Sequence, residues 1–123
     1  MARELSEVLA ELPIDRRERV YETARGLLGV ILKQSDHTVN LKSLKTWPQY
    51  FKLVQQGVKT FEIRKNDRDF QVDDFLLLEE FDPVSGYTGE SILVRVLYII
   101  QGEWGLPADT CVMAITKPLR VLI

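Results

Sequence analysis

The stretch TWPQYFKLVQQGVKTFEIR, residues 46–64, predicts a short helix that leads directly into a β-strand. Pro48 falls in the first turn of the helix and Gly57 lies just past its end, which is the usual placement of these two residues around a helix. The segment KTFEIR, residues 59–64, then alternates apolar and polar side chains, as strands do. A helix and a strand in such close succession favour an α+β fold.

Four further segments have the composition of strands. They are residues 39–45, FLLLEEF at 75–81, ESILVRVLYII at 90–100 and CVMAI at 111–115. The turn sequence DPVSG, which follows FLLLEEF, separates the second of these segments from the third. Several strands at this spacing, with one short helix among them, predict a small β-barrel of mixed strand direction.

The N-terminal part of the chain has helical periodicity. From Leu5 to about Lys33 the apolar residues recur at helical spacing, with a break at Pro13 and a new helix start at Asp15. The apolar stripe would pack either on the barrel or on a second copy of the chain, and the second arrangement would make a homodimer.

A polar, turn-rich segment, SDHTVN at residues 35–40, separates this helical part from the strands. We therefore predict an N-terminal helical extension over residues 1–36 and a β-barrel domain over residues 37–123.

Strand geometry divides the side chains of the segment KTFEIR, residues 59–64, between two faces. Phe61 and Ile63 share one face, which we assign to the core. The opposite face presents a hydroxyl, a carboxylate and a guanidinium, with an ammonium at the end of the row: Thr60, Glu62, Arg64 and Lys59. A carboxylate accepts hydrogen bonds from an amine or amide, and a guanidinium binds phosphate or a carbonyl edge. The row therefore suits a nucleobase or nucleotide.

A simpler interpretation is that this row satisfies itself, with Glu62 paired to Arg64 or Lys59 on an exposed strand. The loop KNDRDF that follows has the same ambiguity. Lys65 and Arg68 could bind phosphate or carbonyl groups, or the loop could be a solvated hairpin tip.

Three aromatic residues could stack on a base. Trp47 and Tyr50 lie at the head of the short helix, although Trp47 could equally belong to the core. Trp104, between two glycines in GEWGL, lies on a loop and could act as a lid or a stacking partner.

The charge and the residue content of the chain limit the classes of function that it can have. The net charge of −2 argues against indiscriminate binding of nucleic acid, but residues 40–68 carry a net charge of +5 and residues 69–109 one of −8. One histidine and one cysteine give no material for a metal cluster, and we predict no cofactor. The short apolar runs, the absence of an export signal and the single Cys111 indicate no membrane association and a cytoplasmic location.

The segment GVKTFEIR, residues 57–64, fits the pattern G-x-K-x-x-E-x-R of the ASCH domains in the PUA-like superfamily. Over residues 40–116 the chain resembles a bacterial and phage branch of that group, known only as a domain of unknown function. The resemblance implies a PUA-like β-barrel with a cleft beside the short helix, in a superfamily that binds RNA or modified nucleosides. It also implies that Lys59, Glu62 and Arg64 line the cleft.

Some ASCH relatives hydrolyse the acetyl amide of N4-acetylcytidine with a lysine, a threonine and a glutamate. Lys59 matches their lysine, whereas Glu62 occupies the position of their threonine, so Thr60 would have to replace it as nucleophile. Three hypotheses follow: a module that binds RNA or a nucleoside, an amidohydrolase that uses Lys59, Thr60 and Glu62, and a regulatory domain that dimerises through its N-terminal helices.

Overall fold

The computed structural model describes residues 2–4, 16–31 and 40–122 of the chain. The elements in chain order are β1 (Ala2–Glu4), α2 (Arg16–Ile31), β2 (Leu41–Thr46), α3 (Pro48–Gln55), β3 (Phe61–Lys65), β4 (Phe75–Asp82), β5 (Gly86–Gln101), β6 (Thr110–Ile115) and β7 (Arg120–Leu122). The α+β class is confirmed. The first of the two predicted N-terminal helices and most of the predicted junction lie outside the described residues.

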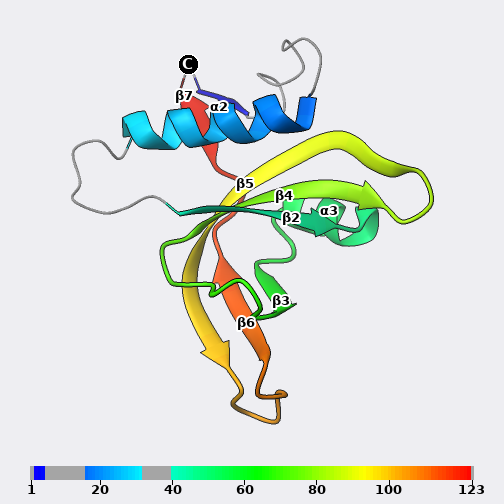
Figure 1. Cartoon of the computed structure of the whole chain (residues 1–123), viewed down its shortest axis with the longest axis vertical. Helices are drawn as coiled ribbons and strands as arrows, with labels where there is room; N and C mark the ends of the chain where they lie inside the picture. The colour runs from blue at the N-terminus through cyan, green and yellow to red at the C-terminus, as the bar shows by residue number, and fades with distance from the viewer. Residues whose placement is uncertain (1, 5–15, 32–39, 123) are drawn as a thin grey trace.

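Five strands form one mixed sheet in the order β2-β4-β5-β6-β3. β2 and β4 are parallel, and the other neighbouring pairs are antiparallel. The long strand β5 bends, so that its first half pairs with β4 and its second half, past a register shift between Val96 and Tyr98, pairs with β6 (Figure 1). The sheet stays open, with β2 and β3 as its edges, and the predicted closed barrel is therefore not what the structure shows.

The interior strand β4 is buried on both faces in its first half. Leu76 and Leu78 point into the main core, together with side chains from α3, β5 and β6. Phe75 and Leu77 point to the other side, where α2 packs across the sheet. Three apolar residues of α2 are buried there: Val20, Ala24 and Leu28. Part of the predicted apolar stripe thus packs on the sheet within the same chain.

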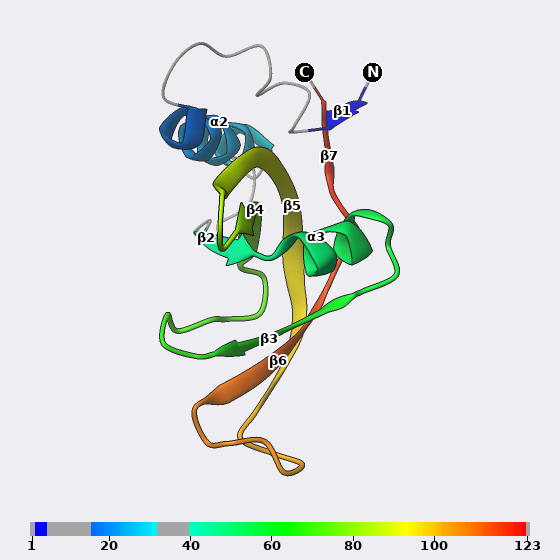
Figure 2. The ribbon, with the colours of Figure 1, turned by 90° about the vertical axis from the view of Figure 1, so that its right-hand side faces the viewer.

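The short helix α3 has the predicted ends. Pro48 occupies its first turn, and Gly57 follows the helix with a φ of 76°, a conformation that glycine adopts without strain. Phe51 and Val54 anchor α3 in the main core. From Gly57 the chain turns into β3, which lies with α3 on one side and β6 on the other (Figure 2).

The predicted orientation of β3 is wrong. Phe61 and Ile63 are 43% and 56% exposed, whereas Glu62 is only 3% exposed. The two faces alternate as expected, but the charged face is the one turned inward. The reason is that cationic side chains neutralise Glu62 on the inner side, while no described element covers the outer side of β3.

The ends of the described chain meet in a small antiparallel pair, β1 with β7, which the sequence analysis did not predict. Within residues 2–4, 16–31 and 40–122, no helix is long and apolar enough to cross a membrane.

Candidate functional site

A groove of about 650 Å³ runs along the free edge of β3. It lies between residues 61–64 of β3, the first turns of α3 and the end of β2. α3 is held in the core by Phe51 and Val54, so its opposite side is free to form one wall of the groove. The polar residues of the motif and the aromatic residues of the helix therefore meet in one hollow.

Glu62 forms the buried polar floor of the groove. Its Oε1 accepts a hydrogen bond from Lys59 Nζ at 2.9 Å, and its Oε2 accepts one from Arg64 Nε at 3.1 Å. The side chains of Lys59, Glu62 and Arg64 are 13%, 4% and 26% exposed. A buried carboxylate needs such partners, because an unpaired charge in the interior is costly. The self-paired row considered from sequence exists, but it is a buried cluster and not an exposed ladder.

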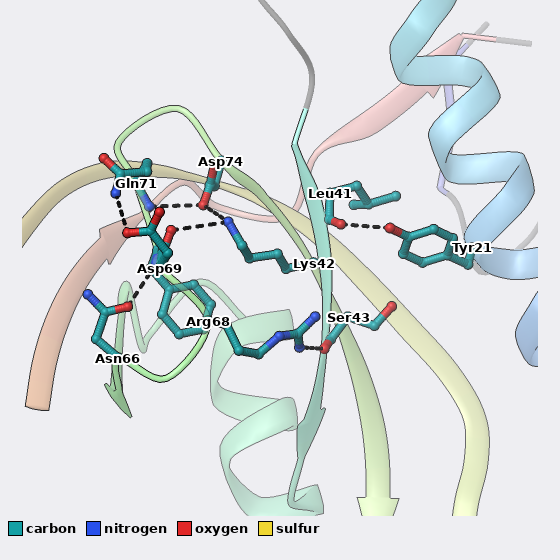
Figure 3. A network of polar contacts seen from close by, with 10 residues as sticks. Tyr21, Leu41, Lys42, Ser43, Asn66, Arg68, Asp69, Gln71 and Asp74 are labelled. Carbon is teal, nitrogen blue, oxygen red and sulfur yellow. Dashed lines mark hydrogen bonds and ion pairs between the residues drawn. The ribbon is translucent and has the colours of Figure 1, made fainter. Parts of the chain in front are cut away.

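Arginine side chains bridge the opening between the two edges of the sheet. The Nη2 of Arg64 donates to the backbone oxygen of Lys45 at 2.9 Å and to Thr46 Oγ1 at 3.3 Å. Arg68 donates to the backbone oxygen of Ser43, as Figure 3 shows. β2 and β3 are thus joined by guanidinium groups where a closed barrel would have backbone hydrogen bonds.

The loop that carries Arg68 is fixed by its own polar contacts (Figure 3). Asn66 Oδ1 accepts a hydrogen bond from the backbone nitrogen of Phe70 at 2.8 Å. The buried carboxylate of Asp74 accepts from the backbone nitrogen of Gln71 at 2.9 Å and pairs with Lys42 of β2. These bonds hold the loop against β2 and place Arg68 beside that strand.

The free edge of β3 also offers backbone groups to the groove. Thr60 O accepts a hydrogen bond from Ile115 N, so alternate residues from Thr60 onward bond to β6. The N–H and C=O groups of Phe61 and Ile63 therefore point away from β6. Lys59 Nζ confirms this direction, because it donates to Phe61 O at 2.6 Å. At Ile63 the open edge presents one donor and one acceptor side by side.

The walls of the groove are aromatic and apolar. Trp47 and Tyr50, from the start of α3, are 50% and 46% exposed. Phe61 and Ile63 line the opposite wall. Lys59 Nζ lies 5.0 Å from the ring centroid of Phe61, which adds a cation–π contact. The groove therefore combines flat apolar surfaces with a charged floor.

The other predicted site residues lie elsewhere. Lys65 and Arg68 line a second groove of about 430 Å³ that adjoins the first. Thr60 is exposed and lies outside the residues that line either groove. Trp104 is 88% exposed in the connection between β5 and β6, away from both grooves.

The structure adds site residues that the sequence analysis missed. Leu53 and Val58 widen the apolar wall, and Lys45 and Thr46 reach the groove from β2. Leu53 follows Tyr50 by three residues and so lies on the same side of α3. This spacing could have indicated Leu53 from the sequence. No local sequence feature indicates Lys45, because Lys45 comes beside Arg64 only in the folded sheet, where β2 pairs with β4.

The described residues contain no group of three or more potential metal ligands. A family model described as "Domain of unknown function (DUF3850)" matches residues 41–115, which span the sheet and both grooves. No curated protein matches the chain.

Proposed function

This chain belongs to the family of domains of unknown function DUF3850, and we propose that its groove binds a nucleobase, either in a free nucleoside or in single-stranded RNA. The observation that carries the proposal is the buried carboxylate of Glu62 at the floor of an aromatic-walled groove. As part of the same proposal, the open mixed sheet is a variant of the PUA-like fold found in ASCH domains. The motif residues Lys59, Glu62 and Arg64 support it by lining one groove.

The chemistry of the floor suits the amino-bearing edge of a base. An ionised carboxylate has about four acceptor positions, and Lys59 and Arg64 occupy one on each oxygen of Glu62. The remaining positions can accept hydrogen bonds from an exocyclic amino group. The backbone donor and acceptor of Ile63, on the free edge of β3, add further hydrogen-bonding groups to the groove.

The walls suit the faces of a base. Trp47 and Tyr50 are half-exposed at the groove and are not needed to fill the core. Stacking on an aromatic side chain contributes about 1–3 kcal/mol per base. Since the groove presents both a hydrogen-bonding floor and stacking walls, it provides the two interactions by which proteins read unpaired bases.

The contacts of the motif favour binding over amide hydrolysis. The ammonium of Lys59 donates to Glu62 and to Phe61 O, so its hydrogen-bonding capacity serves to build the floor. Thr60, the proposed nucleophile of the hydrolase hypothesis, is exposed and lies outside the groove lining. A nucleophile needs a base within hydrogen-bond reach and a substrate beside it.

The proposal is tested by calorimetric titration of the full chain with the four ribonucleosides and a short single-stranded RNA at low salt. We expect at least one amino-bearing nucleoside to bind about tenfold more tightly than uridine, since a hydrogen bond to a charged group contributes roughly 1.5–3 kcal/mol. Glu62→Gln should remove this preference. Tyr50→Ala should weaken all ligands about tenfold through lost stacking.

Tyr98→Ala is the matched control, because Tyr98 is 64% exposed on β5 and lies outside the groove lining. It should bind every ligand as the unmodified chain does. The proposal is wrong if no nucleoside or RNA binds at low salt, or if Glu62→Gln and Tyr50→Ala bind like the control. Release of cytidine from N4-acetylcytidine would instead favour the hydrolase.

A further inference from the structure

The second groove continues from the first across the opening between β2 and β3. The two grooves share Lys45 and Arg64 in their linings. The second is enclosed by four cationic side chains and two acidic ones: Lys45, Arg64, Lys65, Arg68, Asp67 and Glu79. A ligand that fills the first groove and extends over β2 therefore enters a surface with more positive than negative groups.

Lys45 lies at the boundary between the grooves without a carboxylate partner. Its ammonium is 4.6 Å from the ring centroid of Phe81 and 5.8 Å from that of Tyr87. Aromatic rings can hold a cation in place without neutralising its charge. Across the described ranges 2–4, 16–31 and 40–122, neither Lys45 nor Lys65 forms an ion pair.

Several other cations of the domain are paired with carboxylates. Lys42 pairs with Asp74, and Arg95 pairs with Asp73. Lys59 pairs with Glu62 at the floor of the first groove. Among the described lysines that form no ion pair, Lys45 and Lys65 line the second groove, whereas Lys52 and Lys117 line neither groove.

The arginines of the second groove have a different structural role from Lys45 and Lys65. Arg64 and Arg68 donate to backbone oxygens of β2 and so build the wall between the sheet edges. Their positive charge still acts on the groove, but part of their hydrogen-bonding capacity is used within the chain. The lysines are the groups that remain available to a ligand.

We propose that the second groove binds the phosphate of the ligand whose base occupies the first groove, with Lys45 and Lys65 as its direct partners. This inference rests on the proposed function and makes it more specific, since the ligand is then a nucleotide or an RNA residue with its phosphate. Lysine ammonium groups bind phosphate through charge-assisted hydrogen bonds. The two sources of the phosphate, a free mononucleotide and an RNA strand, share this chemistry.

The experiment measures the ratio of two dissociation constants on the full chain, that of a nucleoside over that of its 5′-monophosphate with the same base. We expect a ratio of about ten at low salt, since exposed ion pairs contribute modestly and each 1.4 kcal/mol is one decade. The ratio should fall as salt rises. A double variant, Lys45→Gln with Lys65→Gln, should bring it close to one.

Lys52→Gln is the matched control, because Lys52 is an exposed lysine of α3 that lines neither groove. It should keep the ratio of the unmodified chain. The use of a ratio compensates for any change that the double variant causes in base binding itself. Circular dichroism and a urea titration of the same variants test whether they are folded.

Three outcomes overturn the inference in different ways. If the nucleoside binds and the 5′-monophosphate binds no more tightly, the phosphate site is wrong and the base site stands. If the double variant keeps the full ratio, the phosphate binds elsewhere and the inference also fails. If nucleosides, nucleotides and RNA all fail to bind, both proposals fall. A dinucleotide that binds much more tightly than the mononucleotide would identify RNA as the source of the phosphate.

Discussion

Strands β3 and β4 both combine apolar and charged residues, but different kinds of residue are buried in each. β4 begins with four apolar residues, and all of them are buried, alternately in the main core and under α2. In β3 the apolar residues Phe61 and Ile63 are exposed, and the acidic residue between them is buried. Alternation along a strand therefore identifies two faces without deciding which face is inside.

The difference comes from what lies on each side of the strand. β4 is inside the sheet and has α2 on one face and the main core on the other. β3 is an edge strand whose outer face belongs to an apolar surface. In register with its neighbours, Phe61 lies opposite Ala114 of β6, which lies opposite Tyr98 of β5. Since no described element covers this surface, its apolar residues stay exposed.

The sharpest test of this comparison is a pair of truncations. Leu78→Ala removes a fully buried side chain of β4, and we expect it to lower the free energy of unfolding by about 2–5 kcal/mol. Ile63→Ala removes a side chain that is 56% exposed, and we expect a change of less than about 1 kcal/mol. Urea denaturation followed by circular dichroism measures both. A large loss from Ile63→Ala would mean that the outer face of β3 is covered in solution, and the comparison would fail.

The features that the sequence predicted are those with local causes. Pro48 and Gly57 bracket α3 because the missing N–H of proline and the free φ of glycine act on the residues beside them. The strand segments were found because their composition and alternation are also local. The motif residues Lys59, Glu62 and Arg64 lie within six residues of one another along the chain, and in the structure all three line the first groove.

The features that the sequence did not predict depend on distant partners. Glu62 is turned to the same side as its register partner, the buried Met113 of β6, and a row of alternating residues does not contain this partner. Lys45 reaches the site because β2 pairs in parallel with β4, about thirty residues further along the chain. Arg64 bridges the open side of the sheet to β2, and only the folded arrangement brings these residues together. Trp104 was considered because it lies between two glycines on a loop, and in the structure it does not line either groove.

The buried carboxylate on the inner face of β3 gives a second test, in which the expected change in the free energy of unfolding is smaller. We expect Glu62→Gln to lower the free energy of unfolding by about 1–3 kcal/mol, because it leaves two cations facing a neutral group. The effect is smaller than for a fully enclosed ion pair, since the side chains of Lys59 and Arg64 are 13% and 26% exposed and can recover part of their hydration.

Glu90→Gln is the control for this substitution, because Glu90 is an exposed carboxylate of β5. It should change the free energy of unfolding by less than about 0.5 kcal/mol. The same urea titrations give both values. If Glu62→Gln proves as stable as Glu90→Gln, the cluster contributes nothing to the fold, and the inward orientation of β3 would have to come from backbone pairing alone.

The smallest expected effect concerns the thiol on the inner face of β6. Cys111 pairs in register with Arg64 and is fully buried. Burial raises the pKa of the Cys111 thiol above its ordinary value, against a weaker lowering by backbone hydrogen bonds at Arg64 and Cys111. A thiol reagent should therefore label the folded chain at least about a thousandfold more slowly than the urea-unfolded chain, since a domain with about 5 kcal/mol of stability rarely opens.

The raised pKa of Cys111 also sets the direction of a pH effect. Below the ordinary thiol pKa of about 8.5 the group is protonated in both states, and its contribution to stability is complete. Above that pH the unfolded chain releases the proton while the folded chain retains it, so stability falls by at most about 1.4 kcal/mol per pH unit until the folded pKa is reached. Cys111→Ala lacks this component, so the difference in unfolding free energy between it and the unmodified chain should be constant below about pH 8 and shrink above it. A constant difference up to pH 10, together with rapid labelling of the folded chain, would show that water reaches the inner face of β6. In that case the inner face that β3 shares with β6 would not be buried, and the contrast drawn between the two sides of β3 would be lost.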